Sequence, residues 1–229
     1  MIGALEVNMK KAFTLAEVLI TLGIIGVVAA LTIPPLVNNY RKKQFETGLK
    51  KEYSVLLQAL DMYKQENETP LKREDCTQAR NTFKLALQPY LKILMDCGDN
   101  SSGKCLKLTS ETNNPTYKTY SGRPAREYLF DDGQLILNDG SQLYFENSGE
   151  TNSPNVYVSV DVNGYNKLPN KWGEDLFTFQ LMDDGKLLPM GAEGTFYNSE
   201  ETYCNKTSTS AINGIACANR AIYDSSFWK

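Results

Sequence analysis

The sequence contains no histidine among its 229 residues. Histidine is the usual general base near neutral pH, the partner of serine or cysteine in most nucleophilic triads, and the commonest ligand of transition metals. Its absence therefore argues against a triad hydrolase and against a zinc centre. We expect a protein that is not an enzyme, holds no cofactor and has no assigned metal site.

A strongly basic surface is also lacking. The chain has 24 Lys and Arg against 27 Asp and Glu, for a formal net charge of -3. Proteins that bind nucleic acids usually present a basic face. The nearest candidate, residues 41–43, borders a long apolar run, where a juxtamembrane position explains it better. We expect no nucleic acid to be bound by a basic patch.

The five cysteines form no C-x-x-C pair, which argues against zinc ribbons and thioredoxin-type centres. Cys97 and Cys105 lie close together in polar sequence, and so do Cys204 and Cys217. Such pairs suit short disulfide-closed loops in an oxidising compartment. Cys76 is left over, the connectivity stays open, and a set of reduced buried thiols is the alternative.

A membrane-length apolar run lies near the N-terminus. Residues 18–37 carry no charge, and a helix of about 20 residues crosses a hydrocarbon core about 30 Å thick. Four small residues share one helical face, as in helices that pack closely: Ala16, Gly23, Gly26 and Ala30. Glu17 is the exception, because a carboxylate at membrane depth needs a partner. The alternative is that Glu17 sits among lipid headgroups at the helix end.

The stretch "KKAFTLAEVLITLGIIGVVAALTIP", residues 10–34, resembles the prepilin cleavage and methylation signal of type IV pilins and type II secretion pseudopilins. The family has a short basic leader, a small residue, Phe-Thr-Leu, any residue, Glu, and an apolar helix with a distal proline. The matching positions are Lys10, Lys11, Ala12, Phe13, Thr14, Leu15, Glu17 and Pro34. Ala12 stands where the family usually has glycine.

The resemblance implies that a prepilin peptidase cuts between Ala12 and Phe13 and that the new Phe13 amine is methylated. Residues 1–12 would be the leader, with Met9 as an alternative start. In an assembled filament, Glu17 of one subunit would pair with the Phe13 amine of its neighbour. Breaking one side of a buried ion pair is costly, so this pair would fix the axial register.

Two rival interpretations remain for the apolar run. The small residues up to Ala30 could end a cleavable secretory signal, or the run could be a plain membrane anchor. Either would make the protein a secreted or membrane-tethered binding module, possibly calcium-dependent. Positive charge flanks both ends of the run, so charge alone does not orient it. A single inner-membrane pass with a periplasmic or extracellular head rests on the resemblance and the cysteines.

An amphipathic helix is predicted to follow. Six large apolar residues recur at spacings of three and four: Phe45, Leu49, Tyr53, Leu56, Leu60 and Tyr63. We expect one long helix with Pro34 and Pro35 as a kink. The predicted organisation is a leader at 1–12, a membrane or filament-core segment at 13–37, an amphipathic half at 38–67, and a head at 68–229.

The head pattern indicates an antiparallel sheet. Turn signals occur at Asp132-Gly133, at 138–140 and at Asp184-Gly185. Residues 156–162 and 177–181 alternate as half-buried strands do, and a helix is expected over 77–94. The predicted fold class is α+β and pilin-like, with a long bent N-terminal helix on a sheet of about four to six strands and disulfide-closed loops.

Two acidic patterns could form a catalytic or a metal site. The doublets Asp131-Asp132 and Asp183-Asp184 could form a glycosidase pair, but each precedes a glycine, so turns explain them more simply. Residues 161–177 are rich in oxygen side chains that could hold calcium, and a metal-free loop is favoured because the EF-hand spacing is absent. The calcium candidates are Asp161, Asn163, Asn166, Glu174 and Asp175.

Taken together, the sequence predicts a structural subunit of a type IV pilus-like or type II secretion pseudopilus filament. Its partners would be homologous pilin-like subunits, the prepilin peptidase and methylase, and the inner membrane. The loop from Cys204 to Cys217 resembles the disulfide-closed terminal loop of pilins. The residues do not choose among adhesion, secretion and DNA uptake, or between a major and a minor subunit.

Overall fold

The computed structural model describes residues 14–77, 79–99, 105, 116–126, 128–147 and 155–229. The chain divides into two compact units, Met1–Arg41 and Lys42–Lys229. Helix α1, Leu15–Asn67, supplies residues to both. Each unit is described by itself.

The described part of the first unit is the apolar segment of α1. Its large side chains are exposed, with Leu15 78% and Leu31 72% accessible. Pro34 and Pro35 lie inside the helix. An interior proline removes one helical hydrogen bond, and the kink expected there stays a prediction. A helix with this many exposed apolar side chains needs lipid or other chains to cover it.

The second unit is built on one six-stranded antiparallel sheet in which consecutive strands are neighbours. The strands are β1 (Ile93–Gly98), β2 (Gly133–Leu137), β3 (Gln142–Asn147), β4 (Val156–Asp161), β5 (Leu176–Leu181) and β6 (Leu187–Pro189). The edge strand β6 ends in a proline, which cannot donate to a further strand. The predicted α+β class, with its antiparallel sheet, is confirmed.

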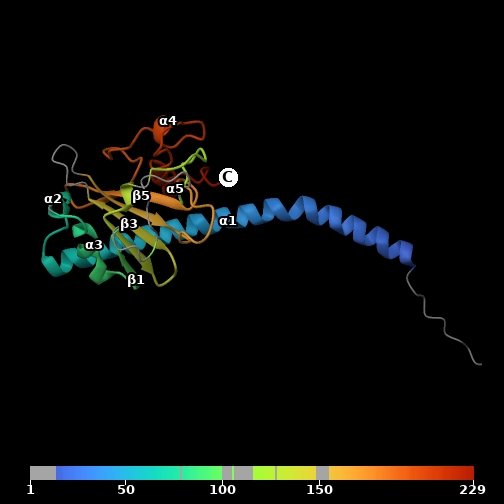
Figure 1. Ribbon diagram of the computed structural model, residues 1–229, viewed down its shortest axis with the longest axis horizontal. Coiled ribbons are helices and arrows are strands. Elements are labelled where there is room, and N and C mark those ends of the chain that lie inside the picture. Colours follow the sequence, from blue (N-terminus) through green and yellow to red (C-terminus); the bar gives the residue numbers. More distant parts are fainter. Residues whose placement is uncertain (1–13, 78, 100–104, 106–115, 127, 148–154) are drawn as a thin grey trace, which may run out of the picture. The chain divides into compact units, whose positions relative to one another are not determined.

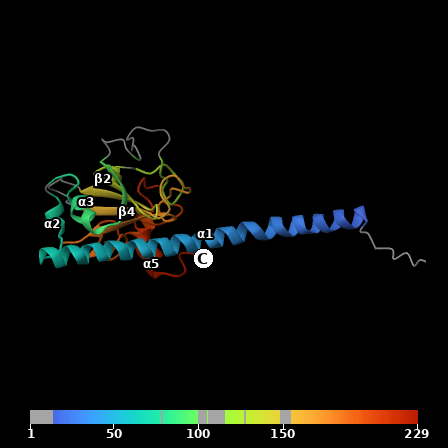
Figure 2. The ribbon, with the colours of Figure 1, turned by 90° about the horizontal axis from the view of Figure 1, so that it is seen from below.

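Residues 42–67 of α1 lie along one face of the sheet (Figures 1 and 2). Leu49 and Leu56 are fully buried in a core that also contains Val158 and Phe179. The Tyr53 ring stacks on Phe179 with centroids 4.9 Å apart. The amphipathic stripe predicted from the sequence therefore forms the contact between helix and sheet.

A second core covers the opposite face of the sheet. It contains Tyr144 and Tyr157 from the strands and Tyr117, Phe130 and Trp172 from the connecting segments. All residues of β4 and β5 are buried as a result. The prediction of half-buried strands is wrong, because segments distant in the sequence cover the face expected to meet solvent.

Short helices lie before, between and after the strands. They are α2 (Arg73–Cys76), α3 (Thr82–Leu87), η1 (Gln88–Tyr90), η3 (Tyr128–Phe130), α4 (Glu200–Tyr203) and α5 (Cys217–Tyr223). The helix predicted over 77–94 is wrong in both bounds. Asn81 precedes α3 in the left-handed region with φ 66°, and Pro89 lacks the N–H that a continuing helix requires. Strand β1 then begins at Ile93.

Two of the three predicted hairpin turns are confirmed. Residues 138–140 join β2 to β3, and Asp184-Gly185 joins β5 to β6. The prediction at Asp132-Gly133 is wrong, because Gly133 is the first residue of β2 and pairs with Phe145. This glycine has no positive φ and contributes to a strand instead of a turn.

Disulfides join Cys97 to Cys105 and Cys204 to Cys217, the two close pairs whose connectivity the sequence left open. Cys76 is a buried free thiol. The chain end is fixed near the start of the packed half of α1, where the Lys42 ammonium donates to the Lys229 carbonyl oxygen at 3.2 Å.

Candidate functional site

The carboxylate of Glu17 forms a reciprocal cap with Thr14 at the start of α1. The Thr14 N–H donates to Glu17 Oε2 at 2.8 Å, and the Thr14 hydroxyl donates to the same oxygen at 2.9 Å. In return, the Glu17 N–H donates to Thr14 Oγ1 at 3.2 Å. This is a capping box, which satisfies backbone N–H groups that a helix start otherwise leaves without partners.

The cap gives Glu17 a partner within its own chain. From the sequence, Glu17 was expected to pair with a neighbouring subunit, and its local partner Thr14 was not predicted. The signal was present, because Thr-x-x-Glu before an apolar run is the signature of a capping box. The register role of Glu17 is not tested by this geometry and stays a prediction.

The expected cleavage and methylation positions, Ala12 and Phe13, lie outside the described residues. The described apolar segment begins directly after them. Helix α1 is long and apolar enough to cross a membrane, with a mean hydropathy of 2.3 in its most apolar window. Length and composition alone support this statement.

Comparison with known families decides what the start of the chain is. The family described as the prokaryotic N-terminal methylation motif matches residues 7–33. The chain carries a prepilin-type N-terminal methylation motif. This motif is the cleavage and methylation signal of type IV pilins and pseudopilins. The match begins at residue 7, includes the Thr14–Glu17 cap and ends at Ile33, the residue before Pro34. No curated protein and no solved structure matches the chain.

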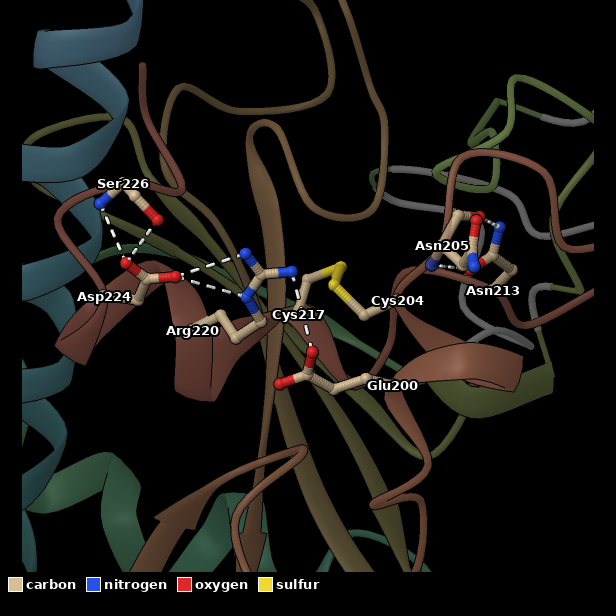
Figure 3. A network of polar contacts seen from close by, with 8 residues as sticks. All are labelled: Glu200, Cys204, Asn205, Asn213, Cys217, Arg220, Asp224 and Ser226. Carbon is tan, nitrogen blue, oxygen red and sulfur yellow. Dashed lines mark hydrogen bonds and ion pairs between the residues drawn. A yellow bond between two sulfur atoms is a disulfide. The ribbon is translucent and has the colours of Figure 1, made fainter.

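Beyond the methylation motif, the head offers a polar cleft beside the Cys204–Cys217 disulfide. Figure 3 shows the polar contacts around this disulfide. It has a volume of about 480 Å³ and is lined by Tyr120, Glu200, Glu201, Cys204, Asn205, Lys206 and Arg220. Arg220 lies 3.6 Å from Glu200 and 3.1 Å from Asp224. The Asn213 amide donates to the Asn205 carbonyl oxygen at 2.7 Å. These contacts tie the terminal loop together and give Arg220 two acidic partners.

The calcium candidates of residues 161–177 do not gather into one oxygen cage. Asp161 accepts hydrogen bonds from the Tyr117 hydroxyl at 2.7 Å and the Gly164 N–H at 2.8 Å. Asp175 accepts from the N–H groups of Asn170 and Lys171. The remaining candidates point elsewhere: Glu174 pairs with Lys171 at 2.5 Å, Asn163 donates to Lys167, and Asn166 is exposed.

Burial raises the pKa of Asp161 to about 6 and that of Asp175 to about 7, the latter with help from the nearby Asp161 charge. The bonds from backbone N–H groups act against this increase. The two carboxylates therefore serve as acceptors for the turns of the loop.

The two acidic doublets have different environments. Asp183 pairs with Arg73 at 2.6 Å and Asp184 with Lys186 at 2.6 Å, as surface residues at a hairpin. Asp131 and Asp132 instead lie beside Glu146 of β3. Burial and the two neighbouring aspartates raise the pKa of Glu146 to about 9. The turn explanation is thus confirmed for the second doublet and wrong for the first.

A second buried acid lies where α1 meets the β2–β3 turn. Glu52 is 2% exposed, and its Oε1 lies 3.2 Å from the Lys51 ammonium. Lys51 also pairs with Asp139 of the turn. Burial, followed by the nearby Asp139, raises the pKa of Glu52 to about 7. This site was not predicted from the sequence. Its signal was an acid on the apolar stripe, three residues after Leu49 and four before Leu56.

Proposed function

We propose that the chain is a non-enzymatic subunit of a helical filament of the type IV pilus or type II secretion pseudopilus kind. The observation that carries this proposal is the methylation motif at residues 7–33. It includes the start of an apolar helix whose large side chains are uncovered within its own unit. The later residues of the same helix form one wall of the head core.

Processing is the first step of the proposed function. A prepilin peptidase removes residues 1–12 by cutting between Ala12 and Phe13, and the Phe13 amine is methylated. Before assembly, the apolar helix holds the subunit in the inner membrane in a single pass. The head then lies in the periplasm, where the two disulfides are compatible with an oxidising environment.

Assembly is the second step. Apolar helices leave the lipid and pack against those of neighbouring subunits, with Gly23 and Gly26 allowing close approach. Apart from its chain neighbours and the local helix backbone, a Cβ atom at either glycine would meet nothing within 4 Å among the described residues. Head-to-tail contacts that do not close on themselves then produce an open fibre.

The Thr14–Glu17 cap is compatible with a pairing between subunits. Both hydrogen bonds that the Glu17 carboxylate accepts from Thr14 use Oε2. In the proposed filament, Oε1 accepts from the Phe13 ammonium of the neighbouring subunit. Glu17 would then stabilise its own helix start and set the register of the next subunit.

The test is the N-terminal mass of the mature protein, purified from cells that contain a prepilin peptidase. We expect a chain that begins at N-methylated Phe13. Cleavage after Ala30 would instead support a secreted module, and an uncleaved chain would support a plain anchor. Both outcomes contradict the filament proposal.

A further inference from the structure

An acidic cluster lies where the start of β2 is paired with the end of β3, away from the methylation motif. Asp131 and Asp132 directly precede β2, and Glu146 is near the end of β3. The three side chains each place a carboxylate oxygen within 4.8 Å of the others. The cluster is held by the sheet, because the Asp132 N–H donates to the Phe145 carbonyl at 3.2 Å and the Asn147 N–H donates to Asp132 Oδ2 at 2.8 Å.

The cation beside this cluster, Arg80, is largely exposed to solvent. Arg80 Nε lies 3.5 Å from Asp132 Oδ1, and the Arg80 side chain is 73% exposed. Exposed ion pairs contribute little because water screens them and the long side chain loses freedom. Asp132 itself is 4% exposed. When all three acids are ionised, they therefore repel one another with little compensation from the exposed arginine.

Tyr157 supplies an independent observation. In the β3–β4 register it lies directly opposite Glu146, so the two side chains leave the same face of the sheet with Cβ atoms about 5 Å apart. Tyr157 is 3% exposed, and its hydroxyl has no hydrogen-bond partner among the described residues. Glu146 Oε2 is likewise buried and without a partner there. A buried hydroxyl without an acceptor is costly, unless a further group completes its bonding.

We propose that Asp131, Asp132 and Glu146 bind a calcium ion, with the Tyr157 hydroxyl facing the site. Carboxylate and hydroxyl oxygens are hard ligands that suit calcium or magnesium. Calcium is favoured because it accepts irregular sets of protein oxygens, whereas magnesium demands a near-ideal octahedron and keeps most of its waters. The ion would neutralise the carboxylates and join the start of β2 to the end of β3. This proposal is independent of the filament proposal.

The chain contains its own matched control. The tripeptide Asp-Asp-Gly occurs at 131–133 and again at 183–185. Only the first copy has a third acid beside it, whereas the second pairs with Arg73 and Lys186. A calcium titration should therefore respond to Asp132→Asn and Glu146→Gln, but not to the double variant Asp183→Asn with Asp184→Asn.

The experiment is calorimetric titration of calcium chloride into the full chain in an uncharged detergent. We expect one saturable site with a Kd of about 0.1 to 1 mM, the range of extracellular calcium modules. Glu146→Gln and Asp132→Asn should each weaken binding by about tenfold or more, and the same chain should bind magnesium chloride more weakly. The absence of saturable binding, or equal loss in the 183–184 control, would overturn the proposal.

Tyr157→Phe separates a ligand-facing role from a structural one. If the hydroxyl faces the ion, this variant binds calcium several-fold more weakly, while its melting temperature without calcium is unchanged or higher. The absence of a cost in apo protein is expected because the lost hydroxyl has no partner in the part of the chain that the structure describes. Unchanged calcium affinity in a folded Tyr157→Phe variant would remove Tyr157 from the site, and unchanged affinity in folded Glu146→Gln would refute the site itself.

Discussion

Thr14 and Glu17 bond to each other in both directions at the start of α1, through Oε2 of the acid and Oγ1 of the alcohol. A carboxylate that caps its own helix stabilises the helix start even in a single chain. The same carboxylate retains a second oxygen for a partner. Glu17 therefore has a local role in the cap, and the proposed pairing between subunits would be a second role that suitable substitutions can separate from it.

The first prediction separates them with Glu17→Gln. The amide oxygen of glutamine can still accept the cap bonds from Thr14, but it carries no charge to pair with an ammonium. If the pairing between subunits exists, Glu17→Gln should lower filament assembly by about tenfold or more, because it leaves a buried ammonium without its counter-charge. The measurement is the amount of processed protein in sheared filaments, relative to the membrane fraction.

Thr14→Val is the matched control for the cap. It removes the hydroxyl and leaves the Glu17 charge, and we expect a smaller loss of assembly than for Glu17→Gln. Assembly of Glu17→Gln at the normal level, with a loss only in Thr14→Val, would show that the cap is the whole function of the pair.

The sequence predicts features that depend on neighbouring residues. The apolar run, the amphipathic stripe through Leu49 and Leu56, and the 138–140 turn all follow from local spacing, and the structure confirms them. Burial of both faces of β4 could not be predicted in this way. It depends on Tyr117 and Trp172, which come from other connecting segments.

The same limit applies to the candidate sites. Asp132 and Glu146 are far enough apart in sequence that no spacing rule joins them, and the β2–β3 pairing brings them together. In the sequence, Glu52 is one polar residue on an amphipathic helix. Only the folded structure shows that the β2–β3 turn lies beside it. The Thr14–Glu17 cap is different, because its Thr-x-x-Glu signature is visible in the sequence. That pattern was explained only by the resemblance to the prepilin signal.

The second prediction concerns the pH dependence contributed by Glu52. Burial raises its pKa from 4.5 to about 7, so the folded protein holds a proton that the unfolded chain has already released in this range. The unfolded state binds fewer protons there, and the free energy of unfolding therefore falls as pH rises from about 4.5 to about 7. The stabilisation is complete below this window and lost above it.

Glu52→Gln removes this titration while keeping the shape of the side chain. We expect the variant to be more stable than the parent by about 2 kcal/mol at pH above about 8, and to show a flatter pH profile. The measurement is urea unfolding of the full chain in detergent across the pH range. The exposed Glu193→Gln serves as control. Parallel profiles for parent and Glu52→Gln would show that Glu52 is ionised in the folded protein.

The third prediction concerns Gly214, which holds the terminal loop against Trp172. Its φ is 107°, a conformation that favours glycine, and a Cβ built there would lie 2.5 Å from Trp172 Cβ. Its N–H also donates to the Tyr203 carbonyl at 2.6 Å, next to the Cys204 disulfide. Gly214→Ala therefore adds a steric overlap to the backbone strain, and neither the Trp172 side chain nor the loop can move without breaking other contacts.

Gly122 provides the comparison that separates strain from overlap. It has a similar φ of 84°, but a built Cβ has no neighbour within 4 Å. We expect Gly122→Ala to cost about 1 kcal/mol of unfolding free energy, from backbone strain alone. Gly214→Ala should cost about 3 kcal/mol or more, because overlap in a packed site adds to the strain. Equal losses in the two variants, measured by urea unfolding, would mean that the loop moves away from Trp172 without cost, and that the glycine is required only for its backbone angle.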